Sequence, residues 1–292
     1  MSGISVIILT YNEQLHLERC IKNILPIAQD IFVVDSYSTD NTVEIATSFG
    51  AKVFQKKWEN NHAKQFNWAL DNLPIKTEWI LRIDADEYLT PELINELNYK
   101  VKLLPPNITG VFFKRRHIFL EKWIKYGFYP TKILRLFRFK KANYRERWMD
   151  EEIQIFEGIT QEFKYDFVDH NLQNFAWWIA KHNNYSTREA IDQIFDELTQ
   201  GINKNLDASN REIKKKSLYS VQPLFFRASV YFVYRYFFKF GFLEGRRGFL
   251  WHFFQAFWYR TLVDVKIYEM KRNCKNVEEL KEFILIQYNI TL

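Results

Sequence analysis

The first hundred residues alternate between short apolar runs and longer stretches whose apolar residues have helical spacing. Residues 4–9 and 31–34 are rich in β-branched and other apolar side chains, which indicates strands. Residues 15–25 and 42–49 repeat apolar residues every three or four positions, as amphipathic helices do. Strands that are apolar on both faces and separated by helices predict an α/β fold with a mostly parallel sheet flanked by helices.

Polar side chains follow three of the predicted strands, at the point where each strand ends. The loops are "TYNE" at residues 10–13, "DSYSTD" at 35–40 and "DAD" at 84–86. Because the carboxyl ends of parallel strands meet at one edge of a sheet, we expect these loops to converge on a single ligand site. They contain neither GxGxxG nor GxxxxGK[ST], which excludes the dinucleotide fingerprint and the P-loop.

Three carboxylates lie within four residues, at Asp84, Asp86 and Glu87. Such charges repel one another unless a positive group lies between them. Mg²⁺ or Mn²⁺ binds one or two carboxylates and completes its shell with phosphate oxygens, so Asp84 and Asp86 predict a metal that stabilises a departing diphosphate. The alternative is a solvated acidic turn, in which Glu87 favours the N-terminus of a helix that begins near Pro91.

Charge is distributed unevenly along the chain. Residues 1–100 carry nine Lys/Arg and fourteen Asp/Glu, whereas the remainder carries 32 and 21, so a basic second region is expected to face an anionic partner. Cys20 and Cys274 have no CxxC or Cys/His companions, which argues against a disulfide framework or a structural zinc site. The start of the chain lacks the basic n-region of a signal peptide, and no run of 18 uncharged apolar residues occurs, so we expect a cytosolic protein without a membrane span.

The region after residue 170 combines predicted helices with many aromatic and basic side chains. Residues 225–260 include seventeen Phe, Tyr or Trp, and residues 211–272 include thirteen Lys/Arg against four Asp/Glu. That mixture is typical of helices in a lipid headgroup layer, so we expect association with an anionic membrane surface. The alternative is that these helices pack against the first region of the chain or against a second copy of the chain in a homodimer. No RRM, KH or helix-turn-helix pattern is present, and the acidic first region would repel a polyanion, which disfavours nucleic acid.

Four segments add a resemblance to a known family. "SVIILTYNE", "FVVDSYSTDNT", "KQFNWAL" and "WILRIDADE", in this order, resemble family 2 glycosyltransferases of the GT-A type, which transfer a sugar from a nucleotide diphosphate with inversion. The resemblance covers about residues 3–170. It implies a Rossmann-like GT-A catalytic domain over residues 1–170, followed by a mainly helical region over 171–292 for membrane association or packing. "RLFRF", "ERWMDEE" and "DHNLQN" further resemble the branch that builds bacterial lipopolysaccharide cores and surface polysaccharides.

The resemblance implies roles for individual residues around the donor. Six residues match positions that bind the nucleotide sugar: Thr10, Tyr11, Glu13, Asp35, Lys64 and Asp84. Asp35 would contact the base and Asp84 the ribose or donor sugar, while Asp86 would be the ligand of Mn²⁺ or Mg²⁺. Lys64 would either meet a phosphate as a point charge or lie in solvent on its helix.

Three nearby residues carry a functional and a structural interpretation. Arg82 precedes the DxD, and an ion pair with the acidic loops is favoured over a phosphate contact. Asp40 matches a turn aspartate of the family and equally suits a cap for the helix that begins at Thr42. His170 has no Cys or second His near it in the sequence, so we interpret it as a structural histidine.

Inverting transfer needs a base that removes the proton from the acceptor hydroxyl. Related families place this carboxylate in an "ED" or "HE" motif after the DxD, and the corresponding stretch here is "WMDEE". Its spelling differs, so the resemblance points to Asp150 or Glu151 without separating them, with Glu152 more remote. The alternative is an acidic turn paired with Arg145 or Arg147.

Together these features predict a metal-dependent inverting glycosyltransferase. The donor is a nucleotide-diphosphate sugar, with UDP favoured, and the acceptor is a hydroxyl of a glycan or lipid-linked molecule in bacterial surface-polysaccharide or lipopolysaccharide biosynthesis. We expect a cytoplasmic protein that is peripheral on the inner face of the cell membrane. Two alternatives are a polyprenyl-phosphate sugar synthase, whose ionised acceptor has less need of a base, and a non-catalytic membrane-associated scaffold with a nucleotide-binding fold.

Overall fold

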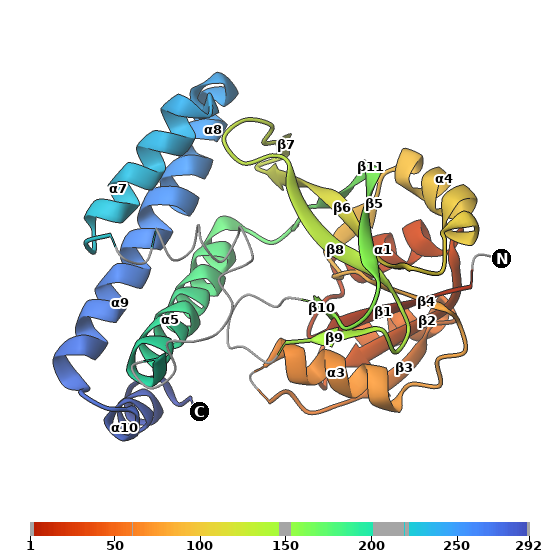
Figure 1. Ribbon diagram of the computed structural model, residues 1–292, viewed down its shortest axis with the longest axis horizontal. Helices are drawn as coiled ribbons and strands as arrows, with labels where there is room; N and C mark the ends of the chain where they lie inside the picture. Colours follow the sequence, from red (N-terminus) through yellow and green to blue (C-terminus); the bar gives the residue numbers. More distant parts are fainter. Residues whose placement is uncertain (1–2, 60, 146–152, 201–218, 220–221, 291–292) are drawn as a thin grey trace. The chain divides into compact units, whose positions relative to one another are not determined.

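The computed structural model describes residues 3–59, 61–145, 153–200, 219 and 222–290 (Figure 1). The chain divides into two compact units, Met1–Gln173 and Asn174–Leu292. The sequence predicts a boundary after residue 170, and the roles that it predicts for the two parts are taken up below as proposals.

The first half of the sheet has the predicted alternation of strands and helices. β1 (Ile4–Thr10) lies between β2 (Ala28–Asp35) and β4 (Trp79–Arg82), β3 (Lys52–Gln55) lies outside β2, and all these pairs are parallel. The helices between these strands are α1 (Leu17–Ile24), α2 (Thr42–Ser48) and α3 (His62–Asn72). The parallel register places the end of β1 beside the end of β2, so the loops that follow both strands start at the same edge.

The second half of the sheet is mixed. Beyond β4 the order continues with β8 (Thr131–Arg138), β6 (Ile108–Phe119), β11 (Ile159–Asp169) and β5 (Glu87–Leu89). β6 and β11 run parallel, whereas β4–β8, β8–β6 and β11–β5 run antiparallel. β7 (Lys122–Trp123) pairs with β6, and β9 (Ala142–Tyr144) pairs with β10 (Ile153–Ile155) in a separate ribbon. The α/β class is confirmed, but the expected "mostly parallel" order holds for the first half of the sheet.

Both faces of the sheet are covered by helices. Successive residues of a strand point to opposite faces. On β1, Val6 and Ile8 join the core beneath α1 and α4 (Pro91–Lys100), whereas Ile7 joins the core beneath α3, and all three are fully buried. α4 starts where the sequence suggests, because the Thr90 hydroxyl accepts a hydrogen bond from the Leu93 N–H, and η1 (Val101–Leu103) follows it. Two covered faces leave the strand ends as the place where polar loops gather.

The second unit is helical. Its elements are α5 (Phe175–Gln200), α7 (Phe226–Val233), η2 (Tyr234–Phe238), η3 (Gly241–Glu244), α8 (Gly245–His252), η4 (Phe253–Trp258), α9 (Tyr259–Asn273) and α10 (Val277–Tyr288). α5 and the helices that follow it confirm the helices predicted after residue 170. Apolar residues of α5, α9 and α10 form its core, among them Ile191, Ile194, Val263, Ile267, Leu280 and Ile284. Among the described stretches of the chain, every helix falls short of the length and apolarity that crossing a bilayer requires.

Lys266 is buried in the second unit, and within the described residues no carboxylate is in hydrogen-bond contact with it. Its ammonium shares its three N–H donors among four oxygens of α5 that lie 2.7–2.8 Å from Nζ: the backbone and side-chain oxygens of Asn183 and the hydroxyls of Ser186 and Thr187. Burial lowers the pKa of Lys266 to about 8, although the nearby Glu269 opposes the shift. The hydrogen-bond partners of this ammonium in the described part of the chain are therefore neutral oxygens.

Candidate active site

The loops after β1 and β2 are joined by hydrogen bonds. The Asn12 N–H donates to the Ser38 hydroxyl at 2.8 Å, and the Thr39 N–H donates back to the Asn12 side-chain oxygen at 2.8 Å. The Glu13 N–H donates to the Thr42 hydroxyl at the start of α2, also at 2.8 Å. Two loops that the sequence separates by 25 residues thus form one ordered edge.

Asp35 lies at the centre of this edge and is fully buried. Its carboxylate accepts from the Thr10 hydroxyl at 3.0 Å and from the Ser38 N–H at 2.8 Å, and it also accepts from the Ser38 hydroxyl. Three donors on a group with about four acceptor sites leave little capacity for a further partner. In this structure Asp35 orders the loops, and the base contact predicted for it stays a prediction.

Asp40 supports the start of α2. Its carboxylate accepts from the Thr42 N–H at 3.0 Å and from the Thr42 hydroxyl, and its other oxygen accepts from the Gln14 N–H at 3.2 Å. Burial raises the pKa of Asp40, but these hydrogen bonds outweigh it and hold the pKa below its ordinary value. The N-cap position of α2 is Asn41, so Asp40 has the structural role that was expected but supports the helix start from the residue before the cap.

Tyr11 and Lys64 are exposed beside the same edge. Tyr11 is 59% exposed. Lys64 lies in the first turn of α3, where its N–H donates to the Asn61 cap at 2.9 Å and its side chain is exposed to solvent. The adjacent Gln65 donates to the Ser36 hydroxyl at 3.2 Å, which holds the start of α3 against the loop after β2. Within the described residues neither side chain has a hydrogen-bond or ion-pair partner, and the donor contacts predicted for both stay predictions.

Asp84, the first carboxylate of the DxD, lies between two arginines. Its Oδ1 is 2.9 Å from Nη2 of Arg82, and its Oδ2 is 3.1 Å from Nη2 of Arg135. The same Arg135 nitrogen forms an ion pair with Glu87, whose other oxygen accepts the Asp84 N–H at 3.0 Å. Arg135 and Glu87 are 3% and 2% exposed. The acidic cluster is thus compensated within the protein, and the predicted ion pair of Arg82 is confirmed.

The pKa values of Asp84, which is partly exposed, and of the buried Glu87 shift in opposite directions. Burial raises the pKa of Asp84, but the charges of Arg82 and Arg135 outweigh it and hold the pKa well below its usual range. Burial also raises the pKa of Glu87, and here the nearby carboxylates of Asp84 and Asp169 add to the increase while Arg135 opposes it. Asp84 is therefore the permanently charged member, and Glu87 is the one that protonates more easily.

Asp86 is held by the segment that follows β11. Asn171 donates its side-chain amide to Oδ2 of Asp86 at 2.9 Å, and the His170 N–H donates to the Asp86 carbonyl at 3.0 Å. Arg19 of α1 donates to the Asp86 carbonyl at 3.1 Å and to the His170 carbonyl at 2.6 Å. Two segments that are distant in the sequence, α1 and the segment after β11, therefore hold Asp86, one through its carboxylate and both through its backbone carbonyl.

His16 ties the loop after β1 to the same segment. Its Nε2 accepts the Leu172 N–H at 2.9 Å, so the ring proton is on Nδ1, which donates to Glu13 at 2.7 Å. His16 is fully enclosed. Glu13, predicted to bind the donor, has this histidine as its partner here. The contacts of Arg135, Arg19, His16 and Asn171 were not expected; an arginine within the apolar "KILRLFRF" strand was the one available signal.

The carboxylates fit a metal that shares its shell with a substrate. Among the described residues, no group of three or more His, Cys, Asp or Glu side chains is arranged to hold a metal by itself. Both oxygens of Asp84 face guanidinium groups, whereas Asp86 has one oxygen on Asn171. Mg²⁺ and Mn²⁺ commonly take one or two carboxylates plus phosphate oxygens, so Asp86 suits that arrangement.

The predicted bases Asp150 and Glu151 lie outside the described residues. The stretch that contains them connects β9 to β10, and the pairing of Tyr144 with Ile153 closes it at its base. Asn67 of α3 fixes Tyr144 by accepting its N–H at 2.8 Å and donating to its carbonyl at 2.9 Å. The Arg82 guanidinium lies over this ring, with its Cζ 5.4 Å from the centroid of Tyr144. The base of this stretch is therefore next to the arginine that holds Asp84.

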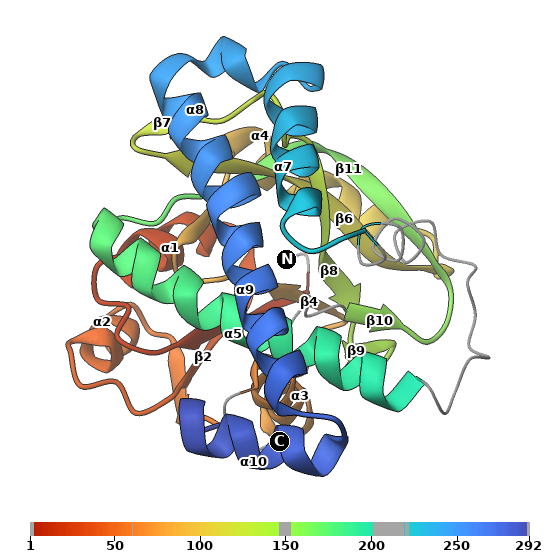
Figure 2. The ribbon, with the colours of Figure 1, turned by 90° about the vertical axis from the view of Figure 1, so that its left-hand side faces the viewer.

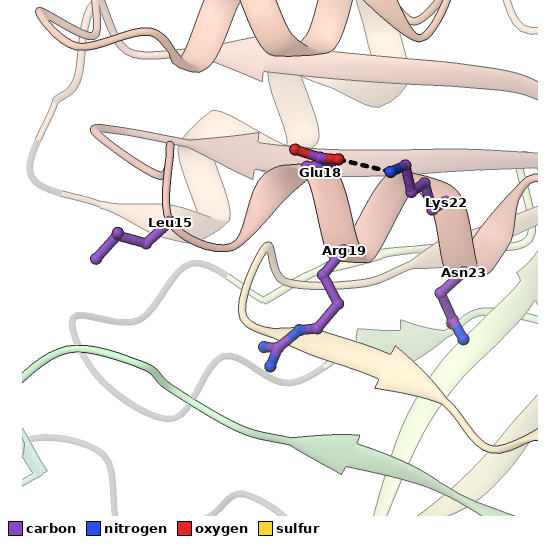
Figure 3. Close-up of a pocket in the computed structure, with 5 residues that line it drawn as sticks. All are labelled: Leu15, Glu18, Arg19, Lys22 and Asn23. Atoms are coloured by element: carbon purple, nitrogen blue, oxygen red, sulfur yellow. Dashed lines mark hydrogen bonds and ion pairs between the residues drawn. The ribbon is translucent and has the colours of Figure 1, made fainter.

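A shallow hollow of about 560 Å³ lies along α1 (Figure 3). Its lining residues are Leu15, Glu18, Arg19, Lys22 and Asn23, and Glu18 pairs with Lys22 at 2.6 Å. Asn23 bonds both the N–H and the carbonyl of Leu89 on β5, at 2.7 and 3.0 Å. Through Arg19 and Asn23 the helix supports the DxD loop and the strand after it, so the hollow borders the acidic cluster without containing it.

Comparison with known proteins agrees with this architecture. Residues 5–163, more than half of the chain, match the family model described as glycosyl transferase family 2. An uncharacterized glycosyltransferase of Rickettsia bellii (strain RML369-C) is 47% identical over 96 residues, which is 33% of this chain and 32% of that protein. One of Rickettsia felis (strain ATCC VR-1525 / URRWXCal2) is 43% identical over 99 residues, 34% of each chain. The chain thus matches about a third of the length of these relatives.

A solved structure shows the same fold over both units. The mannosyltransferase PcManGT from Pyrobaculum calidifontis, in complex with GDP-Man and Mn²⁺, is 15% identical with a TM-score of 0.53, over 91% of this chain and 87% of that one. The predicted GT-A fold is thereby confirmed, while the resemblance to the lipopolysaccharide branch stays a prediction. With its family model matched from the first strand to β11, this chain belongs to glycosyl transferase family 2.

Proposed function

We propose that the protein is a metal-dependent inverting glycosyltransferase that uses a nucleotide-diphosphate sugar, with UDP as the favoured nucleotide. The observation that carries this proposal is the meeting of the loops after β1, β2 and β4 at one sheet edge, with Asp84 and Asp86 beside them. Ligands of open α/β sheets bind at this edge.

The residues of this edge divide the work of holding the donor. Asp84, kept ionised by two arginines, faces the ribose or the donor sugar as a fixed acceptor. Tyr11, Thr10 and Glu13 line the nucleotide, and exposed Lys64 offers a point charge to a phosphate. Asp86 would hold Mn²⁺ or Mg²⁺, which when bound supplies Lewis-acid stabilisation of the leaving diphosphate. Asn171 and Arg19 orient Asp86 for this purpose.

The acceptor hydroxyl would lose its proton to Asp150 or Glu151. Their connection starts beside Tyr144 and Arg82, which supports a base near the donor-binding carboxylates. The acceptor class that we propose is a glycan or lipid-linked molecule of bacterial surface polysaccharide or lipopolysaccharide. A polyprenyl-phosphate acceptor is the alternative, because an ionised phosphate has less need of a base. Family membership disfavours a non-catalytic scaffold.

We also place the protein at an anionic membrane surface, peripheral on the inner face of the cell membrane. Exposed aromatic and basic side chains of the second unit support this placement. A homodimer formed through the same helices is the competing proposal, and the experiment in the next subsection separates the two.

Donor binding is tested by thermal unfolding with UDP, GDP, UDP-sugars and GDP-mannose, each with and without Mn²⁺. GDP is included because the Pyrobaculum mannosyltransferase binds GDP-Man. A ligand at about 100 times its Kd stabilises a protein by roughly 2.7 kcal/mol, so a shift of several degrees is expected for the preferred nucleotide with Mn²⁺. Asp86→Asn should remove the metal-dependent part of the melting-temperature shift. Asp71→Asn, which makes the same change at an exposed position of α3, should leave that shift unaltered. The absence of any shift with either nucleotide would overturn the proposal.

A further inference from the structure

Large apolar side chains of the second unit are exposed over one short stretch. Between residues 225 and 250, twelve of them are exposed: Phe225, Phe226, Val230, Val233, Tyr234, Phe237, Phe238, Phe240, Phe242, Leu243, Phe249 and Leu250. Soluble proteins rarely leave so many neighbouring apolar groups in water unless the surface binds something. The most exposed is Phe238, at 70%, followed by Phe226 at 59%.

This stretch is a helical hairpin with a tight end. Figures 1 and 2 show α7 beside the helical rod of α8 and α9, with η2 and η3 at the turn between them. α7 contacts η4, and α8 contacts both η2 and η3. We call residues 237–250, which form the turn and most of α8, the hairpin tip. It carries Phe238 and Phe240 at its end.

Glycines hold the hairpin tip closed. A Cβ on Gly241 would overlap the His252 ring and approach the Arg235 carbonyl at 2.9 Å, and a Cβ on Gly248 would overlap Glu244. Phe240 and Gly245 have positive φ angles of 61° and 65°, which make the sharp turn. The exposed rings therefore project from an ordered, closely packed turn, and their exposure is built into the fold.

The exposed charges of the hairpin tip are all positive. They are Lys239, Arg246 and Arg247, and within the described part of the chain none of them forms an ion pair with a carboxylate. Glu244, the one acid of this stretch, is 5% exposed and faces inward. The outer surface of the hairpin tip thus offers aromatic rings and cations without a compensating anion.

A hollow of about 410 Å³ repeats this combination on α8. Tyr236, Phe249 and Leu250 line it with apolar surface, while Arg246 supplies a guanidinium at the same place, beside Gly245. An apolar wall next to a cation suits a molecule with an acyl chain and a phosphate. The hollow and the exposed rings belong to one surface.

We propose that the hairpin tip is the element that binds the membrane, with Phe238 and Phe240 at the level of the lipid headgroups and acyl boundary and Arg246 and Arg247 on the phosphates of anionic lipids. Interfacial helices combine buried rings with cations in this way. The inference rests on the membrane association proposed above. It adds which element of the chain binds the membrane and that the lipids bound are negatively charged. It does not depend on which sugar is transferred.

A second copy of the chain fits the same surface less well. In a two-fold dimer each patch meets its own equivalent, so Lys239, Arg246 and Arg247 would face like charges. No exposed acid lies among the residues of the hairpin tip to relieve that repulsion. A negatively charged lipid surface relieves it at every cation.

The test is co-sedimentation of the full chain with vesicles of phosphatidylcholine alone and of phosphatidylcholine with 30% phosphatidylglycerol. Phe238→Ser/Phe240→Ser should abolish most binding, and Leu285→Ser/Ile286→Ser, which changes two exposed apolar residues of α10, should not. Arg246→Gln/Arg247→Gln should lower the partition coefficient for anionic vesicles roughly 25-fold, about fivefold for each cation. Lys275→Gln/Lys281→Gln removes the same charge from exposed positions of the same unit and should change it less than threefold.

Each outcome separates this inference from the proposed function. If Phe238→Ser/Phe240→Ser binds the vesicles as well as the wild type does, the hairpin tip is not the membrane-binding element. Membrane association itself would then still stand. Equal binding to both vesicle types would overturn the anionic-lipid assignment. If the wild type binds neither vesicle type, or if light scattering shows a dimer that depends on Phe238, the membrane-binding proposal is overturned. The melting-temperature shift with nucleotide tests the proposed transferase function independently of both results. The melting temperature of each variant is also measured, and an unchanged value shows that a loss of vesicle binding is not caused by unfolding.

Discussion

The Nη2 atom of Arg135 lies 3.1 Å from the carboxylate of Asp84 and also bonds Glu87, so one buried guanidinium joins the first DxD carboxylate to the strand after it. Arg135 lies on β8 and is packed over the Phe167 ring of β11 at 5.1 Å. The acidic loop is therefore ordered by a cation from the sheet itself, and the positive group between the carboxylates is already present before any ligand binds.

Removing Arg135 should destabilise the protein strongly. Arg135→Met leaves the buried Glu87 without its cation, and breaking one side of a buried ion pair costs about 3–5 kcal/mol of unfolding free energy. Lys52→Gln, which breaks the partly exposed pair with Asp30, should cost about 0–1 kcal/mol. Denaturant unfolding measures both. Arg135→Met/Glu87→Gln should recover part of the loss, and equal costs for Arg135→Met and Lys52→Gln would contradict this account.

Asn171 is predicted to be a positioning residue for the metal ligand. Asn171→Ala removes the hydrogen bond to Oδ2 of Asp86 and leaves the carboxylate itself in place. Loss of such a partner typically lowers metal affinity roughly 10- to 100-fold. Titration of Mn²⁺ calorimetrically in the presence of UDP measures the change, with Asn72→Ala on the surface of α3 as the matched control. Unaltered Mn²⁺ affinity in Asn171→Ala would show that Asp86 is oriented by other contacts.

Measuring the turnover of single variants should show whether Asp150 or Glu151 is the base. Substitution of the base by its amide should lower kcat by about 10²- to 10⁴-fold, because proton removal then lacks its acceptor. Asp150→Asn and Glu151→Gln should both keep the melting shift with UDP and Mn²⁺, since neither belongs to the donor site. Full turnover in both variants would favour an ionised phosphate acceptor over a hydroxyl.

Lys266 should impose a pH dependence on stability. Its pKa falls from 10.5 to about 8 on folding, so between these values the unfolded chain binds more protons than the folded one. Stability contributed by this group therefore rises as pH increases from 8 to 10.5. The rise should be absent from Lys266→Met and retained in Lys271→Met, whose lysine pairs at the surface with Glu197. Denaturant unfolding at pH 7, 8.5 and 10 measures the difference, and parallel curves for wild type and Lys266→Met would refute it.

The residues at the carboxyl ends of the parallel strands are the part of the site that the local sequence pattern predicts. Thr10, Asp35 and Asp84 each follow a predicted strand, and parallel strands bring their ends together by rule. The contacts of Asp86 with Asn171, His170 and Arg19 do not follow from any such rule. Asn171 and His170 reach it because β11 returns antiparallel to β5, and that pairing depends on side chains spread over the whole sheet.

The α/β alternation of the first hundred residues, the carboxylates at the strand ends and the aromatic, basic character of the second unit can all be predicted from the amino-acid sequence. These properties are local, because hydrophobic period and residue chemistry can be read within a short window. The neutralisation of Asp84 and Glu87 by Arg135, and the concentration of exposed rings at one hairpin turn, become visible in the folded chain. Partner choice and exposure depend on how distant segments pack, and strand register and close glycine contacts are properties of the folded chain as a whole.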